Sequence, residues 1–154
     1  MLRPEKEITD PAALADIIRR AQVCHLGMCK DNQPYVVPLN FGYEDGALYM
    51  HCAQVGMKLD FLCANDRVCF ELEVDAALVT GPGPCECSMK YRSVIGFGKA
   101  NIIDDVDEKR KVLDIIMRHY VEAETYEYAE KALQKTVIIK VEISSMTGKQ
   151  SKYP

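Results

Sequence analysis

Residues 35–58 read YVVPLNFGYEDGALYMHCAQVGMK and decide the fold of this chain. Large apolar side chains recur at every second position over residues 35–43, which is typical of a strand with one buried face. Asp45-Gly46 predicts a tight two-residue turn, because both positions accept the positive φ that such a turn requires. Residues 47–53 then return as the partner strand, so the stretch predicts a β-hairpin.

Two features of this stretch do not fit a plain hairpin. Pro38 cannot donate to a ladder, which favours an edge strand or a place where a flat ligand lies against the backbone. Gly56, Met57 and Lys58 begin a helix whose N–H groups, with a lysine beside them, suit a phosphate. Together these features predict a flat cofactor with a phosphorylated tail. A bulged hairpin with a surface lysine explains the same residues equally well, since a single Gly-x-Lys is weak evidence.

Length and charge exclude several classes of protein. The chain has 154 residues, which predicts one domain over residues 1–154. Its net charge of −4 argues against nucleic acid as a partner, because nucleic-acid binding needs a basic surface. No apolar run approaches the span of a bilayer, and the N-terminus is too charged for a signal peptide. We therefore expect a cytoplasmic protein that binds neither nucleic acid nor membrane.

The chain holds seven cysteines, and this odd number favours reduced thiols over a disulfide framework. Four of them fall within strand or helix patterns and are expected to be small core residues: Cys24, Cys52, Cys63 and Cys69. Cys85-Glu86-Cys87 is more suggestive of a ligand pair. A structural zinc site needs a second pair with similar spacing, and none follows, so we expect no metal site.

The rest of the chain predicts further strands separated by short helices. Strands are expected over residues 23–29, 67–74, 91–103 and 136–144, and helices from Asp10-Pro11, over 104–120 and over 126–135. Residues 75–89 have no periodicity and are expected to form a long loop. About six strands with hairpin-like spacing predict a mainly β fold, a closed antiparallel barrel with peripheral helices.

Two glycines and two histidines receive structural interpretations. Gly96 and Gly98 lie inside an expected strand, which indicates a bend or the close approach of another backbone. His25 lies in the first expected strand and His119 near the end of an expected helix, where its imidazole suits the helix dipole. We interpret both histidines as structural residues.

Five blocks of the sequence resemble one known family. They are Pro34–Phe41, Leu48–His51, Gly56–Asp60, Tyr91–Gly98 and Thr147–Lys149. In this order they are similar to the FMN-binding split-barrel family of pyridoxamine 5'-phosphate oxidase, and within it to the nitroimidazole-resistance branch. The likeness covers nearly the whole chain. It implies a six-stranded antiparallel split β-barrel that binds FMN at the interface of a homodimer.

The resemblance also implies which residues bind the cofactor. The edge of the flavin ring is placed along Val37, Pro38, Leu39 and Asn40, with His51 and Cys52 by the ring or the ribityl chain. The phosphate is placed on Gly56, Met57 and Lys58, and the site is completed by Arg92 and Ser93. Lys149 is either at the pyrimidine end of the flavin or a solvated charge at the chain end.

One departure bears on the reaction. Relatives that oxidise pyridoxamine phosphate hold it with an arginine-rich ending, whereas this chain has no arginine after Arg118. The resemblance therefore implies an FMN-dependent oxidoreductase of another kind. It would take electrons from a reduced nicotinamide or another donor and pass them to a small aromatic or nitro compound, with His51 as the catalytic proton donor. His51 could equally bond the cofactor or a neighbouring chain, and a non-catalytic flavin, deazaflavin or haem module remains the alternative.

Overall fold

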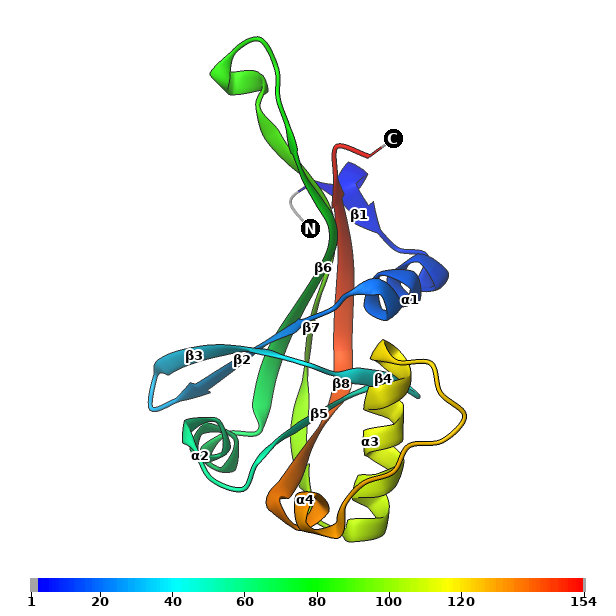
Figure 1. Ribbon diagram of the computed structural model, residues 1–154. Coiled ribbons are helices and arrows are strands. Elements are labelled where there is room, and N and C mark those ends of the chain that lie inside the picture. Colours follow the sequence, from blue (N-terminus) through cyan, green and yellow to red (C-terminus); the bar gives the residue numbers. More distant parts are fainter. Residues whose placement is uncertain (1–2, 154) are drawn as a thin grey trace.

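The computed structural model describes residues 3–153, and its strands form one antiparallel sheet that carries helices at its periphery (Figure 1). The strands are β1 (Glu7–Ile8), β2 (Cys24–Lys30), β3 (Gln33–Leu39), β4 (Gly42–Glu44), β5 (Ala47–Ala53), β6 (Arg67–Val79), β7 (Ser88–Ile103) and β8 (Thr136–Ser151). The helices are α1 (Pro11–Arg20), α2 (Met57–Ala64), α3 (Val106–Tyr120) and α4 (Glu130–Lys135), with 3₁₀ turns η1 (Pro4–Lys6) and η2 (Pro84–Glu86). The predicted mainly β architecture with peripheral helices is confirmed.

The order of the strands explains how the sheet closes. It runs β3-β2-β6-β7-β8-β5-β4, with β1 added to β8. The two end strands, β3 and β4, are consecutive in the chain and are joined by only Asn40 and Phe41. A connection this short brings the two edges of the sheet to the same place, which curls the sheet into a split barrel. The edge position predicted from Pro38 is confirmed, because β3 ends this order.

The strand predicted over residues 35–43 is in fact two strands. β3 pairs with β2, and only the short β4 pairs with β5, so the predicted hairpin is confined to residues 42–53. Its turn is confirmed, since Asp45 and Gly46 have φ of 50° and 74°. The predicted number of about six strands was too small, because this strand is divided in two and because the sequence pattern did not reveal the two-residue β1.

Four element boundaries were also wrong. β6 and β7 extend into the expected loop 75–89 from both ends and form a ribbon, with η2 near its tip, that projects from the barrel (Figure 1). A bulge between Val74 and Ala77 introduces this ribbon and hides its periodicity. β8 runs seven residues beyond the expected end at 144, to Ser151, and α4 covers only Glu130–Lys135.

Capped helices close the barrel core. The carboxylate of Asp10 accepts from the N–H of Ala12 at 3.1 Å, which confirms the predicted start of α1. α1 buries Leu14, Ile17 and Ile18 in the main core. α3 packs against Ile138 of β8 in a smaller cluster. In the part of the chain that the structure describes, no helix is long and apolar enough to cross a membrane.

The glycines of β7 confirm the predicted close approach. A Cβ at Gly98 would lie 2.3 Å from the carbonyl oxygen of Glu142, beside a bulge between Phe97 and Gly98. A Cβ at Gly96 would lie 2.2 Å from the ring of Phe70. These two positions let β8 and a core aromatic ring approach β7 more closely than any side chain would allow.

The cysteines are less buried than expected. Cys24 is buried and Cys52 is half-buried, but Cys63 and Cys69 are exposed, which contradicts their assignment to the core. Cys69 is exposed because it lies on the outward face of the sheet, opposite Phe97 of β7. All seven cysteines are free thiols.

Candidate cofactor site

The start of α2 has the features that a phosphate requires. Gly56 precedes the helix with φ of 138°, and no side chain caps this end. The carbonyl of Gly56 accepts from the N–H groups of Leu59 and Asp60, while the helix offers no acceptor to the N–H groups of Met57 and Lys58. A Cβ at Gly56 would have no atom within 4 Å, so the space in front of these amides is open.

A cation and two titratable side chains surround this helix start. His51 is an exposed residue, yet partial burial of its imidazole lowers its pKa, and the charge of Lys58 lowers that pKa further. Burial raises the pKa of the Cys52 thiol, and Lys58 opposes that rise. Lys58 therefore acts electrostatically on both residues. The structure thus brings together five of the predicted site residues, His51, Cys52, Gly56, Met57 and Lys58.

The residues predicted to lie along the flavin ring occupy the edge strand β3 and its end. Val37 and Leu39 are half-buried and pack against the core, while Pro38 and Asn40 are exposed. Within residues 3–153, β3 pairs with β2 alone, so its other side keeps backbone groups for a ligand. Tyr35 of β3 packs on Phe61 of α2 with ring centroids 5.1 Å apart, which ties this edge to the helix carrying Lys58.

Arg92, Ser93 and Lys149 lie elsewhere in the chain. His51 of β5 is the partner of Ile138 on β8, and Ile138 is in turn the partner of Ile103 on β7. Arg92 lies eleven residues before Ile103 on β7, which corresponds to about 36 Å along the strand. Ser93 is buried and sits opposite Lys149. A single chain therefore does not bring these three residues to the His51–Lys58 cluster.

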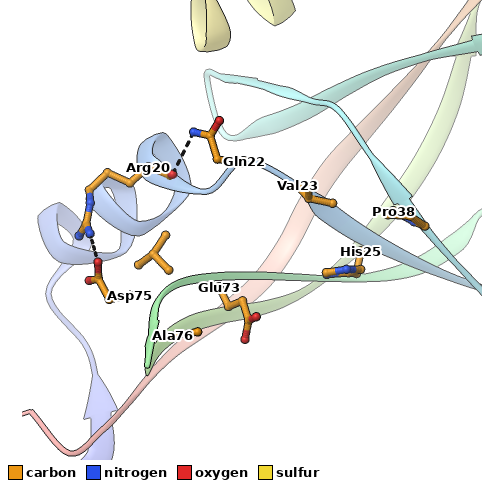
Figure 2. A pocket seen from close by; sticks show the side chains of 9 residues that line it. Arg20, Gln22, Val23, His25, Pro38, Glu73, Asp75 and Ala76 are labelled. Atoms are coloured by element: carbon orange, nitrogen blue, oxygen red, sulfur yellow. Dashed lines mark hydrogen bonds and ion pairs between the residues drawn. The ribbon is translucent and has the colours of Figure 1, made fainter. Parts of the chain in front are cut away.

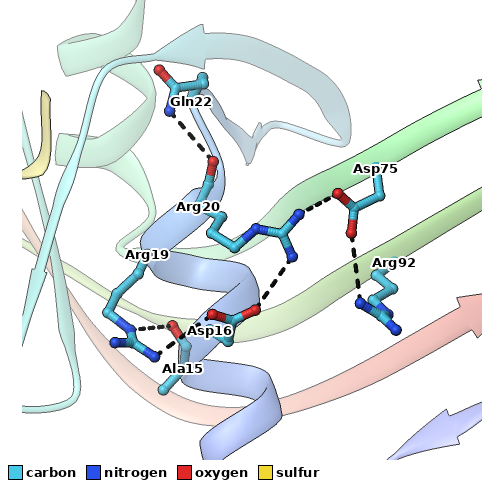
Figure 3. Close-up of polar contacts among 7 residues, drawn as sticks. All are labelled: Ala15, Asp16, Arg19, Arg20, Gln22, Asp75 and Arg92. Carbon is cyan, nitrogen blue, oxygen red and sulfur yellow. Dashed lines mark hydrogen bonds and ion pairs between the residues drawn. The ribbon is translucent and has the colours of Figure 1, made fainter.

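Arg92 has local partners of its own. Its guanidinium lies 3.7 Å from the carboxylate of Asp75 and 3.9 Å from the centre of the Tyr153 ring. Asp75 also pairs with Arg20, which in turn contacts Asp16 (Figure 3). This network links the end of α1 to the base of the β6–β7 ribbon.

A cavity of about 580 Å³ opens beside Pro38 (Figure 2). It lies between the end of α1, the outward face of β2 and the bulged part of β6, and its lining includes Val23, His25, Glu73 and Val74. The Nδ1 atom of His25 lies 3.1 Å from Oε2 of Glu71. Sequence reasoning missed His25 as a site residue, because its place beside Pro38 comes from the register of β2 and β3 and from no local motif.

The same outward face carries an exposed apolar row. Val36, Gly27, Cys69 and Phe97 are successive partners across β3, β2, β6 and β7. Val36 is 61% exposed and Phe97 is 58% exposed. A cavity of about 890 Å³ follows this row. Among the described residues, no three histidine, cysteine, aspartate or glutamate side chains gather where they could hold a metal ion.

Comparison with known proteins agrees with this geometry. A family model described as pyridoxamine 5'-phosphate oxidase matches residues 10–150. A candidate 5-nitroimidazole antibiotic resistance protein from Bacteroides thetaiotaomicron is 38% identical with a TM-score of 0.83, over 94% of this chain and 86% of that one.

More distant structures share the fold alone. The FAD and heme binding protein from Mycobacterium smegmatis is 22% identical with a TM-score of 0.86, over 96% of this chain and 74% of that one. The flavocytochrome Anf3 from Azotobacter vinelandii is 20% identical with a TM-score of 0.84, over 97% and 71%. An uncharacterised protein of Rhizobium meliloti is 27% identical over 56 residues, and the match spans only 36% of the length of that relative.

Proposed function

Because the chain belongs to the pyridoxamine 5'-phosphate oxidase family, we propose that it binds FMN and uses it to reduce a small aromatic nitro compound. Reduced nicotinamide is the proposed electron donor. Bound FMN supplies the redox chemistry, and the protein supplies position and electrostatics. The relative from Mycobacterium smegmatis that has the same fold binds FAD, which supports a flavin in general. The choice of FMN rests on the features below.

The start of α2 is the observation that carries this proposal. A phosphate monoester is a dianion that is best held by N–H groups and a cation together. Met57 and Lys58 present N–H groups without helical acceptors, and the charge of Lys58 is near enough to lower the pKa of His51. The open space at Gly56 admits an oxygen atom where a side chain would exclude it. The residues present therefore fit the phosphate of FMN.

The ring and ribityl chain would extend from this helix towards β3. The unpaired side of β3 offers backbone groups to the polar edge of a flavin, and Pro38 offers an apolar surface. His51 stands beside Lys58, whose charge opposes protonation of its ring. In this proposal His51 donates or accepts a hydrogen bond to the cofactor as a neutral imidazole, and Cys52 packs beside it.

A nitro compound is favoured as the electron acceptor over pyridoxamine phosphate. The candidate 5-nitroimidazole resistance protein matches nearly the whole chain at 38% identity.

A second copy of the chain would complete the site. Arg92, Ser93 and Lys149 lie far along β7 and β8 from His51, which stands beside Lys58 in the same chain. The exposed row formed by Val36, Cys69 and Phe97 offers an apolar face for such a copy. We therefore include a homodimer in the proposal. Phe97→Glu should yield a monomer in light scattering with much weaker FMN binding, and a dimeric variant that retains FMN would refute this face.

The test of the FMN site is a matched pair of lysine variants. Lys58→Ala should bind FMN at least tenfold more weakly, because a charge-assisted hydrogen bond contributes about 1.5–3 kcal/mol. Lys111→Ala removes an exposed lysine of α3 and should bind FMN like the unaltered chain. Fluorescence titration of FMN measures both. Equal affinity in the two variants would show that the phosphate lies elsewhere.

Turnover separates an enzyme from a binding module. The FMN-loaded protein should lose its yellow colour with reduced nicotinamide and regain it with a 5-nitroimidazole in the absence of oxygen. A protein that keeps FMN but shows neither change is a flavin-binding module. A haem absorption band in the purified protein would show that the bound cofactor is haem and not FMN.

A further inference from the structure

His25 lies where a flavin ring on Pro38 would end. The two residues are partners across the antiparallel β2–β3 pair, and such partners project to the same face of a sheet. Both line the 580 Å³ cavity on the outward face (Figure 2). A planar molecule stacked on the ring beside Pro38 would therefore have the His25 imidazole at its edge.

Glu71 fixes the orientation of this imidazole. It is the partner of His25 on β6, and its Oε2 atom lies 3.1 Å from Nδ1. With Nδ1 directed to the carboxylate, Nε2 is the nitrogen left for a molecule in the cavity. Burial raises the pKa of Glu71 and so does the neighbouring Glu73, whereas the bond to His25 lowers it.

The charges around His25 come from β6 and α1. Glu71 and Glu73 face it from β6, and Arg20 and Asp75 line the same cavity from α1 and from the bulge. Arg20 is occupied by Asp75 and Asp16, and the β3 side contributes the uncharged Pro38. The carboxylate next to His25 thus has no competing cation in direct contact with it among the described residues, and it is free to hold the imidazole.

The rest of the cavity suits a small aromatic ring. Val23, Val74 and Pro38 supply apolar walls, while Gln22 and Glu73 supply hydrogen-bonding groups. A volume of about 580 Å³ is within the range of sites that hold small molecules.

We propose that this cavity holds the electron acceptor, a small aromatic nitro heterocycle, and that His25 gives it a proton while Glu71 acts as the positioning residue. This inference rests on the proposed FMN site. Two-electron reduction of the acceptor follows R–NO₂ + 2 e⁻ + 2 H⁺ → R–NO + H₂O. One N–O bond breaks and the oxygen leaves as water. The two electrons and one proton come from the reduced flavin, which the nicotinamide donor reduces, and the Nε2 of His25 gives the second proton to the leaving oxygen.

The first test needs no turnover. The chain has three histidines, so the oxidised FMN-loaded protein gives three sets of imidazole signals in NMR, which single His→Gln variants assign. Titration with a 5-nitroimidazole should shift the His25 signals in a saturable manner and leave those of His119 unchanged. His119 is the internal control because its ring is not part of the cavity lining; it bonds the carbonyl of Ala21, at 2.7 Å, on the chain between Arg20 and Gln22.

The second test follows the pH dependence of flavin reoxidation by the same compound without oxygen. The rate in the unaltered chain should fall as pH rises, because the step takes a proton from a general acid. His25→Gln should be at least tenfold slower near pH 6, with a flat profile, because a general acid contributes about 10²–10⁴-fold. Glu71→Gln should also be slower, because the ring loses the carboxylate that orients it, and Glu124→Gln, at an exposed site, should behave like the unaltered chain.

The outcomes separate this inference from the proposed function. A chain that takes up no FMN, or whose reduced flavin is not reoxidised by the nitro compound, overturns both. A chain that does both, but whose His25 signals ignore the 5-nitroimidazole, overturns the inference alone. So does a His25→Gln variant that keeps FMN together with the rate and pH profile of the unaltered chain.

Discussion

The hydroxyl of Tyr120 accepts a hydrogen bond of 2.9 Å from the backbone N–H of Phe41. The same hydroxyl donates to the carbonyl of Gln22 at 3.0 Å. One side chain of α3 therefore holds the two-residue connection between β3 and β4 and the segment that leads into β2. Because this connection joins the two edges of the barrel, Tyr120 determines where β3 ends and where Asn40 lies.

Loss of this hydroxyl should destabilise the barrel without changing its packing. Tyr120→Phe leaves the N–H of Phe41 without a partner, and an unsatisfied polar group costs about 1–3 kcal/mol. Tyr126→Phe is the control, because the Tyr126 hydroxyl bonds the carbonyl of Val121 at an exposed position. Urea unfolding of both variants measures the free energies. Similar values for the two would show that the connection does not depend on Tyr120.

The break at Asn40 shows what a sequence pattern could and could not predict. Phe41 and Tyr43 keep the every-second-residue pattern, and Phe41 is fully buried, so the pattern is the same for one strand or two. What divides the strand is pairing with residues far along the chain, which a local pattern does not contain. The edge position was predictable, because Pro38 limits pairing through its own chemistry.

The candidate site divides in the same way. Gly56, Met57 and Lys58 are neighbours in the chain, and so their arrangement at the start of a helix was predictable from sequence. The position of His25 beside Pro38 depends on strand register, and the separation of Arg92 from Lys58 depends on the length of β7. Both are properties of the assembled sheet.

The close contact at Gly98 predicts a large effect from one methyl group. In Gly98→Ala the new Cβ would meet the carbonyl oxygen of Glu142, a backbone atom that can move only if β8 moves. We expect a loss of about 1–3 kcal/mol or more in unfolding free energy. Gly83→Ala, where the nearest atom is 4.0 Å away and φ is −129°, should change little. Thermal and urea unfolding measure the stability of both variants. A stability loss confined to Gly98→Ala indicates a rigid β7–β8 contact, whereas equal stabilities would show that β8 can move to relieve the clash.

The buried thiol of Cys24 predicts a loss of stability at alkaline pH. Burial raises its pKa from 9.0 to about 12. The folded chain therefore keeps a proton that the unfolded chain releases above about pH 9, and stability falls as pH rises from there towards 12. The slope is about 1.4 kcal/mol per pH unit for this one group. Cys24→Ala should remove this part of the slope and exposed Cys63→Ala should keep it, as urea unfolding at several pH values would show.

The electrostatic link between Lys58 and His51 predicts a shift in an NMR titration. Burial and the Lys58 charge lower the pKa of His51 in the folded chain. A base with a lowered pKa adds stability above its ordinary pKa, and this stability is lost as pH falls through the folded value. Lys58→Ala should raise the pKa of His51 towards its ordinary value and reduce the loss of stability in acid. An unchanged His51 titration in this variant would mean that the two residues are not coupled in solution.

Gly56 offers the sharpest separation of stability from cofactor binding, because Gly46 provides a matched control. Both glycines have positive φ, 138° and 74°, and neither has an atom within 4 Å of a built Cβ, so alanine at either position strains the backbone without a clash. Each substitution should cost about 1–3 kcal/mol of unfolding free energy. Only Gly56 adjoins the N–H groups proposed to hold the phosphate, whereas Gly46 lies in the turn between β4 and β5. Gly56→Ala should therefore also weaken FMN binding at least tenfold in fluorescence titration, while Gly46→Ala keeps the affinity of the unaltered chain. If both variants lose FMN equally, the loss reports general destabilisation, and the start of α2 is not the phosphate-binding site.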